Sequence, residues 1–324
     1  MMILQRKEQG QMIDFRSLPR LDASISYLYI EHAIVDKKDN AIEIIRKSGR
    51  TLVPIAATTC LFLGPGTSIT HAAIGVITEV GCSCIWCGEK IRKFYASGIG
   101  ETRQSKNLLL QAKLCMDEEL HLEVAKRMYK LRFPDFKSIS KMSLEQMRGL
   151  EGTRMRSIYK IESKKTGVPW HGRKYDPKRI DASDEINKAL TIANALLYGI
   201  CQSAIVTLGL SPGLGFIHTG HALSFVYDIA DLYKSMTTIP ASFEAVNKKK
   251  NTARSIDEIV REVCRKYFFG NKILSHIPTD ISYLFGCDLP NEKDYPDYND
   301  IWVNGFEVID GGKNYSGDEE DLVW

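Results

Sequence analysis

The sequence predicts an α+β fold in which an N-terminal β-sheet domain precedes a larger all-α catalytic domain. Short β-branched and aromatic runs fill residues 24–96, and apolar residues recur with helical spacing from Ser105 onward. The glycine-containing segment Ser97–Gly100 separates these two textures. The expected domains are residues 1–97, with residues 1–23 as a leading arm, residues 98–289, and an acidic, aromatic C-terminal tail over residues 290–324.

The first domain is expected to hold five strands and one short helix. Polar turns at Asp36–Asn40 and Ser48–Arg50 separate its apolar runs. The strands are expected at Ser26–Ile30, Ala41–Ile45, Thr51–Ile55, Cys60–Leu63 and Cys82–Trp86, and the helix at Thr70–Val80.

The second domain is expected to consist of helices. Leu108–Arg132 contains neither Gly nor Pro, so it is predicted to form one continuous helix that ends before Pro134. The next helix opens with a capping box at Ser143–Gln146. The later helices are expected at about Ser143–Lys165, Asp184–Leu208, Ala222–Lys234 and Ile256–Phe268.

Charge is divided unevenly along the 324 residues. The chain has a formal net charge of +3, but the tail carries −8 and residues 1–289 carry +11. The strong positive charge of residues 1–289 predicts a polyanionic partner such as nucleic acid. The first residues, Met1–Lys7, hold too short an apolar run for a signal peptide, and no apolar run is expected to reach transmembrane length. We therefore expect a cytoplasmic protein without a membrane partner.

The eight cysteines are then expected to be reduced thiols. Cys82, Cys84 and Cys87 could chelate zinc, but no fourth ligand is nearby in the sequence. Buried strand thiols are the favoured interpretation.

A histidine and two acids predict part of a hard-metal site. His218 lies in a glycine-flanked loop before a helix that carries Asp228 and Asp231 three residues apart, and hence on one face. Their neighbours are apolar, so the acids are expected to be largely buried and to need a partner or a function. The alternative is an ordinary polar face near a helix start, where acids offset the helix dipole.

A third acid is bracketed by glycines inside a predicted helix. Gly149 and Gly152 flank Glu151, although each helical glycine costs about 1 kcal/mol relative to alanine. This cost indicates that something bulky approaches the backbone there. Nearby arginines, Arg148 and Arg154 among them, favour a phosphodiester, and close helix packing is the alternative.

These motifs together resemble the CRISPR-associated integrase family of bacterial adaptive immunity, in its type I-E form. The resemblance runs from about Ser26 to Pro278. Besides the two motifs above, it rests on Leu63–Thr67, His71–Ala73, Tyr95–Gly98, Leu109–Leu114 and Val168–Pro177.

The resemblance implies a metal-dependent DNA endonuclease and integrase that captures protospacer DNA and inserts its 3′-OH ends into the repeat array. It implies Mg²⁺ or Mn²⁺ held by Glu151, His218 and Asp231, with Asp228 as a further acidic position. Lys234 is expected to join this catalytic set by clamping a phosphate. The implied partners are double-stranded DNA, a second copy of the chain, and a small ferredoxin-like CRISPR-associated adaptation protein.

Further basic and aromatic residues are expected to bind DNA by clamping phosphates or by stacking on splayed bases. For Trp170, core packing is an equal alternative. His221 stands where the family often has a lysine, and it is either an extra phosphate donor or a neutral spectator. His32 falls near the position of a duplex-splitting tyrosine. The expected DNA-binding residues are Arg148, Arg154, Trp170, Arg173, Lys174, Tyr175, His221, Arg261 and Arg265.

Two other functions fit the sequence: a repair-type nuclease that cuts branched DNA without integrating it, and a catalytically silent DNA-binding scaffold. In the tail, Ile301–Ile309 alternates enough to add as a strand to another sheet, so we expect it to help dock the ferredoxin-like partner. A disordered acidic end is the alternative for this segment.

Overall fold

The computed structural model describes residues 27–91, 94–98, 105–134, 142–173, 183–286, 301–302 and 308–309. The leading arm, Lys174, Tyr175 and most of the C-terminal tail therefore lie outside the described residues. The chain divides into two compact units, residues 1–287 and 288–324.

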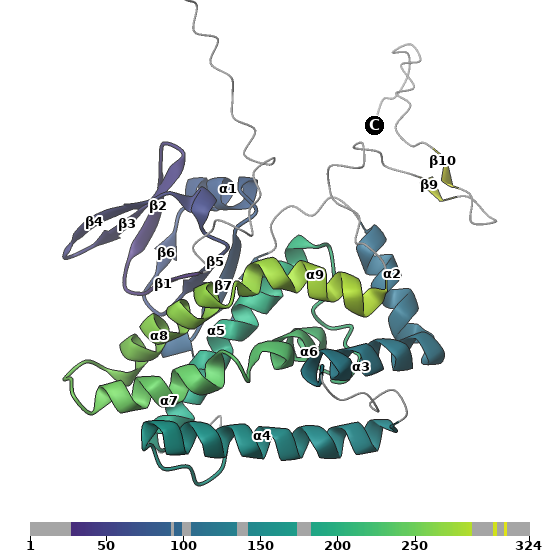
Figure 1. Cartoon of the computed structure of the whole chain (residues 1–324). Coiled ribbons are helices and arrows are strands. Elements are labelled where there is room, and N and C mark those ends of the chain that lie inside the picture. The colour runs from purple at the N-terminus through teal and green to yellow at the C-terminus, as the bar shows by residue number, and fades with distance from the viewer. Residues whose placement is uncertain are drawn as a thin grey trace, which may run out of the picture. The chain divides into compact units, whose positions relative to one another are not determined.

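The N-terminal part of the first unit contains two four-stranded sheets (Figure 1). One has the order β4-β3-β2-β6, in which β2, β3 and β4 form an antiparallel meander and β6 lies parallel to β2. The other has the order β1-β5-β7-β8, with only β8 antiparallel to its neighbour. The strands are β1 Leu28–Ile30, β2 Ile34–Lys38, β3 Ala41–Arg46, β4 Gly49–Val53, β5 Cys60–Leu63, β6 Ser68–Ile69, β7 Ser83–Cys87 and β8 Phe94–Gly98.

Helix α1, His71–Glu79, packs against both sheets and begins where the Thr70 hydroxyl accepts a hydrogen bond from the backbone N–H of Ala73. Short 3-10 helices span Ile55–Ala57 and Glu89–Ile91. Apolar side chains of both sheets and of α1 form one core cluster. Removing this apolar surface from water stabilises the region by roughly 25 cal/mol per Å².

The rest of the first unit is helical. Helix α5 is its centre, and α6, α7, α8 and α9 pack around it (Figure 1). The helices are α2 Lys106–Met116, α3 Glu118–Arg132, α4 Leu144–Thr166, α5 Glu185–Thr207, α6 Ser224–Tyr233, α7 Thr238–Lys249, α8 Ile256–Gly270 and α9 Ile273–Phe285. The predicted α+β class, with strands first and helices after, is confirmed.

The sheet region and α5 meet at Gly199. A Cβ at this position would overlap the ring of Phe62 on β5 and would lie 3.2 Å from Cδ1 of Ile85 on β7. Glycine is therefore needed for the close approach. Gln202 of α5 donates a hydrogen bond to the hydroxyl of Ser97 on β8, and Tyr27 donates its hydroxyl to the carbonyl of Arg261 on α8.

Helix α5 corrects the expectation that no apolar run reaches transmembrane length. It is long and apolar enough to cross a membrane by length and composition, but 83% of its most apolar window is buried within the protein. That burial is typical of a core helix, whose apolar surface is covered by protein.

Several predicted elements were wrong. Asp36 to Lys38 belong to β2, and the turn is limited to the next two residues, where Asp39 has a φ of 54°. The strand predicted at Thr51–Ile55 ends at Val53. Helices α7 and α9 were not predicted, because Pro240 and Pro278 interrupt their sequence patterns. Pro240 lies in the first turn of α7, where no intrahelical donor is lost.

The long helix predicted over Leu108–Arg132 is two helices. Asp117 has an extended backbone and caps both of them, and its carboxylate accepts a 3.0 Å hydrogen bond from the backbone N–H of Leu120. Side-chain capping of this kind competes with helix continuation, so a helix can break without Gly or Pro.

In the second unit, β9 Ile301–Trp302 and β10 Val308–Ile309 pair with each other as antiparallel strands.

Candidate active site

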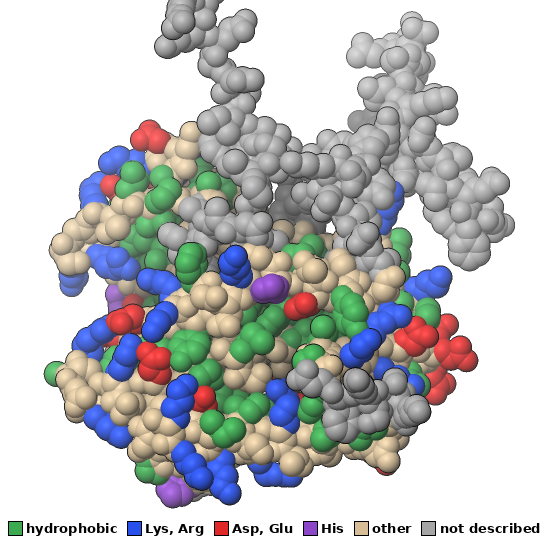
Figure 2. Space-filling model, viewed as in Figure 1, with side chains coloured by type: hydrophobic (Ala, Val, Ile, Leu, Met, Phe, Trp, Pro, Cys, Tyr) green, Lys and Arg blue, Asp and Glu red, His purple; other side chains and the backbone are tan. Residues whose placement is uncertain are grey.

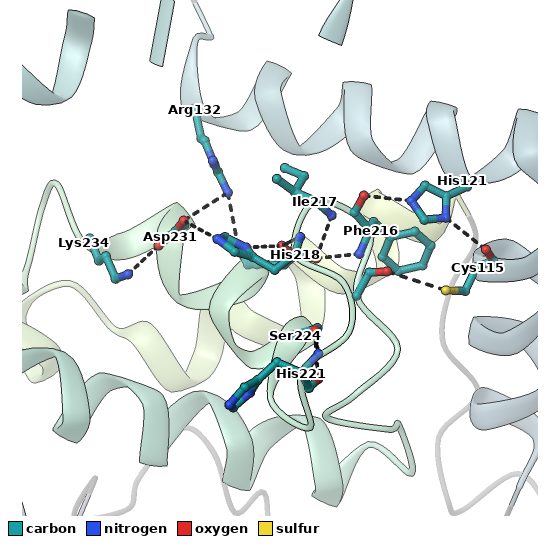
Figure 3. Close-up of polar contacts among 12 residues, drawn as sticks. Cys115, His121, Arg132, Phe216, Ile217, His218, His221, Ser224, Asp231 and Lys234 are labelled. Atoms are coloured by element: carbon teal, nitrogen blue, oxygen red, sulfur yellow. Dashed lines mark hydrogen bonds and ion pairs between the residues drawn. The ribbon is translucent and has the colours of Figure 1, made fainter. Parts of the chain in front are cut away.

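The loop between α5 and α6 is held by one buried carboxylate. Asp228 on α6 is fully buried and accepts three backbone hydrogen bonds from this loop; Figure 3 shows the loop residues Phe216, Ile217 and His218. The donors are the N–H groups of Phe216 at 2.6 Å, Ile217 at 3.0 Å and His218 at 2.9 Å. A buried carboxylate is stable only when its lone pairs are satisfied, so this acid orders the loop that carries the histidine.

The same carboxylate orients the imidazole of His218. Nδ1 of His218 lies 2.7 Å from Oδ1 of Asp228, and Nε2 lies 3.9 Å from Oδ2 of Asp231. The Asp228 hydrogen bond raises the pKa of His218, although partial burial of the ring opposes it. In the neutral ring whose proton lies on Nδ1 and is donated to Asp228, Nε2 carries the lone pair and faces Asp231. Metal-binding histidines are commonly oriented by a carboxylate in this way.

Asp231 lies between two cations. Its Oδ1 is 2.6 Å from Nζ of Lys234, and its Oδ2 is 4.0 Å from Nη2 of Arg132. Burial alone would raise the pKa of Asp231, but Lys234 and Arg132 outweigh burial and lower it. Burial likewise opposes the charge on Lys234, yet Asp231 and Tyr198 raise the pKa of its amine. The geometry thus keeps both groups of the pair ionised.

Arg132 is a site residue that the sequence reasoning missed. Its side chain is 3% exposed, and Nη2 lies 3.5 Å from the carbonyl oxygen of Asp228. Its guanidinium lies over the ring of Tyr129 at 5.4 Å, and its Nε has no hydrogen-bond partner among the described residues. Its position next to apolar neighbours at the end of a predicted helix was the only signal in the sequence.

Glu151 lies on α4 and is paired with Arg154. Two hydrogen bonds of 3.1 Å join the guanidinium to both carboxylate oxygens. A Cβ on Gly149 would meet nothing within 4 Å, and one on Gly152 would meet only a side-chain nitrogen of Arg156 at 3.7 Å. Among the residues that the structure describes, close helix packing therefore does not explain these glycines, and there is space beside both of them.

A small apolar cluster links α4 to the histidine loop. Tyr129 of α3 and Met147 of α4 are buried together, and Ile217, the residue before His218, packs against them. Burial raises the pKa of Tyr129, while Arg132 and then Arg148 oppose the rise, so Arg148 also lies near this cluster. The cluster brings the helix of Glu151 towards the loop of His218.

The donors at this site have the chemistry that Mg²⁺ or Mn²⁺ requires: carboxylate oxygens and one imidazole nitrogen. The carboxylate of Glu151 forms an ion pair with Arg154, and the carboxylate of Asp231 forms one with Lys234. Within the described ranges, no three His, Cys, Asp or Glu side chains gather closely enough to hold a metal ion. The ligand set Glu151, His218 and Asp231 therefore stays a prediction, and its assembly requires Glu151 to leave Arg154.

Two residues predicted to bind DNA are engaged in packing. The indole of Trp170 stacks on Tyr159 at 4.3 Å and 7°, and it meets the edge of Phe243 at 5.9 Å. The guanidinium of Arg173 donates to the carbonyl and side-chain oxygens of Asn187 and to the hydroxyl of Thr191. Of the two interpretations of Trp170, packing is the one this structure supports.

Arg261 and Arg265 of α8 lie over the first strand region. The guanidinium of Arg261 is 4.8 Å from the ring of Tyr29, and that of Arg265 is 5.8 Å from the ring of Tyr27. Such cation–π contacts leave the outer edge of a guanidinium able to donate. His32 is exposed, and its ring lies over Gly66.

His221 presents one donor outward. Its Nδ1 accepts a 3.0 Å hydrogen bond from the backbone N–H of Leu223, so the ring proton is on Nε2. The ring is exposed and points away from Asp231 (Figure 3).

The cysteines of the sheet region are buried. Cys82, Cys84 and Cys87 are each at most 4% exposed, and burial raises the pKa of the Cys84 and Cys87 thiols to about 12. Protonated thiols of this kind are poor zinc ligands, which supports the interpretation as buried strand residues.

Figure 2 shows Lys and Arg side chains spread over the helical part in this view, with apolar side chains between them.

Comparison with known proteins places these features in a family context. Residues 135–267 match the family described as "CRISPR associated protein Cas1". A "CRISPR-associated endonuclease Cas1 2" of Thermus thermophilus is 42% identical over 311 residues, which cover 94% of each chain. A crystal structure of a "TtCas1-DNA complex" is 45% identical, with a TM-score of 0.61 over 83% of this chain and 99% of that chain. A "Casposase bound to integration product" shares the fold, with a TM-score of 0.62 at 16% identity over 84% of this chain and 94% of that one.

Proposed function

Since this chain belongs to the CRISPR-associated endonuclease Cas1 family, we propose that it is a divalent-metal-dependent DNA endonuclease and integrase of CRISPR adaptation, in the type I-E form. Its substrates are a protospacer duplex and the repeat array. The DNA-bound relative and the basic character of residues 1–289 support a DNA substrate.

The observation that carries this proposal is the placement of His218 Nε2 3.9 Å from Asp231 Oδ2, beside Lys234. A nitrogen and an oxygen at this separation need to move only slightly to share one divalent ion. Glu151 supplies the further carboxylate from α4.

The reaction is a transesterification. The 3′-oxygen of the incoming strand forms a bond to a phosphorus atom of the repeat DNA. The attacking 3′-hydroxyl gives up its proton. The bond from that phosphorus to the 3′-oxygen of the neighbouring repeat nucleotide breaks, and this released 3′-oxygen takes up a proton. When bound, Mg²⁺ or Mn²⁺ would lower the pKa of the attacking hydroxyl and neutralise charge on the phosphoryl oxygens.

The residues of this chain prepare the site for that chemistry. Asp228 fixes the ring of His218 so that Nε2 faces Asp231. Lys234 and Arg132 keep Asp231 ionised and therefore able to bind a cation. Lys234 stays charged, so it can also donate to a phosphate oxygen once DNA enters.

The proposed assembly is a homodimer joined to a small ferredoxin-like CRISPR-associated partner. The acidic tail, residues 290–324, is proposed to dock that partner by strand addition. Truncation before Pro290 tests this idea by isothermal titration with the purified partner. Loss of binding is expected, and undiminished binding contradicts docking by the tail.

The test of the function is joining of a labelled protospacer-like duplex into a supercoiled plasmid that bears a repeat, with the partner and Mg²⁺ or Mn²⁺ present. Asp231→Ala is expected to abolish joining, and a donor with 3′-deoxy ends is expected to be inert. The control variant is Asp36→Ala on β2, which lies outside the site. Cleavage of branched DNA without joining would instead favour the repair-type nuclease, and binding without either activity the scaffold.

A further inference from the structure

The loop that carries His218 is held along its other side by one face of α2. Asn107, Gln111 and Cys115 are four residues apart, so they lie in one row on that helix. Each donates a hydrogen bond to a backbone carbonyl of the segment that follows α5. The acceptors are Leu208 at 2.8 Å for Asn107, Ser211 at 3.0 Å and Leu214 at 2.9 Å for Gln111, and Gly215 at 3.5 Å for the Cys115 thiol.

His121, near the start of α3, continues this row. Its Nδ1 lies 2.9 Å from the carbonyl oxygen of Cys115, and its Nε2 lies 2.8 Å from the carbonyl oxygen of Phe216 (Figure 3). The ring also meets the edge of the Phe216 ring at 5.3 Å. The Phe216–Ile217 peptide is therefore fixed from both sides, because its N–H, that of Ile217, donates to Asp228 at 3.0 Å.

The chemistry of these two contacts defines the protonation state of the ring. A carbonyl oxygen only accepts, so each ring nitrogen must donate. A neutral imidazole has one N–H and would set a lone pair against one of the two oxygens. Only an imidazolium satisfies both contacts.

The surroundings include groups that favour this cation and one that opposes it. Cys115 is in the last turn of α2, where carbonyl oxygens lack helical partners and the dipole is negative. The first turn of α3 is unfavourable to a cation, but Asp117, Glu118 and Glu119 offset it. Among the described residues, the Cys115 thiol and the buried Asp228 are titratable groups of other elements that contact this stretch, through Gly215 and Ile217. Within the described part of the chain, no carboxylate forms an ion pair with the His121 ring.

We propose that His121 is bound as an imidazolium and that it is a positioning residue for His218. It acts through the Phe216–Ile217 peptide, just before the proposed metal ligand. The break between α2 and α3 is then functional, because a continuous helix would not let the ring of His121 reach back to the carbonyl of Cys115. The effect on catalysis rests on the proposed function, whereas the protonation state does not.

The first test uses nitrogen-15 NMR of the ring in the full-length wild-type chain at about pH 7.5, where an ordinary imidazole is mostly neutral. Both nitrogens of His121 are expected to carry protons. His276 is the internal control, because it is exposed on α9 and its ring makes no hydrogen bond among the described residues. A singly protonated His121 ring would overturn the proposal.

The second test compares His121→Arg, which keeps a cation with several donors, with His121→Phe, which keeps the ring shape without donors. His276→Phe is the matched control. In the Phe variant, amide hydrogen exchange across residues 215–218 is expected to rise, and strand transfer to fall about 10- to 100-fold, as misplaced catalytic groups commonly cause. The Arg variant is expected to restore both readouts towards wild type.

Equal losses in the Arg and Phe variants would show that the ring only fills space, and they would overturn the positioning role. If the Phe variant does not fold, the wild-type NMR result and the Arg variant still decide the matter. Absence of strand transfer by the wild-type chain would count against the proposed function, while the NMR and exchange results would still test His121 on their own.

Discussion

The Nζ atom of Lys234 lies 2.6 Å from Oδ1 of Asp231, one helical turn away, and this pair faces His218 from the α6 side. Both side chains are less than a quarter exposed, so the charge of each depends on the other. The pair is the main electrostatic feature of the site.

This dependence predicts a large coupling between the two residues. In a double-mutant cycle with Lys234→Met and Asp231→Asn, we expect a coupling energy of about 1–3 kcal/mol in the free energy of unfolding, because each single variant removes the nearest opposite charge from a largely buried ion. Urea denaturation measures it. The control is the exposed pair Arg254 and Glu258, 3.5 Å apart, for which a coupling near zero is expected. Equal coupling in both pairs would contradict this account.

Asp228 is expected to be the most sensitive acid of the site for stability. Asp228→Asn places an amide against three backbone N–H donors and should destabilise the fold by about 3 kcal/mol. Thermal unfolding followed by circular dichroism gives the value. Asp36→Asn is the matched change on β2, and a much smaller loss is expected there. Similar losses would mean that the loop contacts contribute little.

Arg154 competes with any cation for Glu151, since it makes two hydrogen bonds to that carboxylate. We therefore predict that Arg154→Gln tightens Mn²⁺ binding by a few-fold, as isothermal titration without DNA would detect, because the metal no longer has to displace a guanidinium. Arg156→Gln is the control, because Arg156 donates to the hydroxyl of Thr153 rather than to Glu151. Weaker binding in the Arg154 variant would indicate that the arginine organises the site rather than blocks it.

Thiol labelling should separate one cysteine from six others. In a Cys287→Ser background, maleimide is expected to modify Cys115 in the native protein well before the rest, because buried thiols stay protonated and inaccessible. Burial raises the pKa of each of the six buried thiols. It also raises the pKa of Cys115, which is partly exposed, but to a smaller degree. The slow group is Cys60, Cys82, Cys84, Cys87, Cys201 and Cys264. Peptide mass spectrometry reads the order, and early labelling of a sheet cysteine would contradict the described packing.

The parts of the site that lie close together in the sequence could be predicted from it. His218, Asp228 and Asp231 fall within one loop and one helix, so their spacing alone indicated that the ring folds back over the acids. Arg132 could not be found in this way, because it reaches Asp231 from α3, and no local pattern reports that approach.

Interactions that no local sequence pattern reports also explain the errors in the predicted fold. The helix class was clear wherever apolar residues recur, as in α5, but a side-chain cap at Asp117 broke a pattern that contained neither Gly nor Pro. Likewise, the role of Trp170 depends on Tyr159 and Phe243, which reach it from two different helices. Such contacts are decided by tertiary packing, which the sequence does not display.

Phe62 and Ile85 of two neighbouring strands pack against α5 at Gly199. This contact constrains the number of residues between Gly199 and the end of α5 as well as the identity of residue 199. One inserted or deleted residue turns a helix by about 100°. An insertion between Gly199 and the end of α5 would therefore keep the sheet in place but rotate the start of the following segment away from Asn107 and Gln111. A change in the number of residues in that last part of α5 would separate the anchor of the sheet from the loop that presents His218.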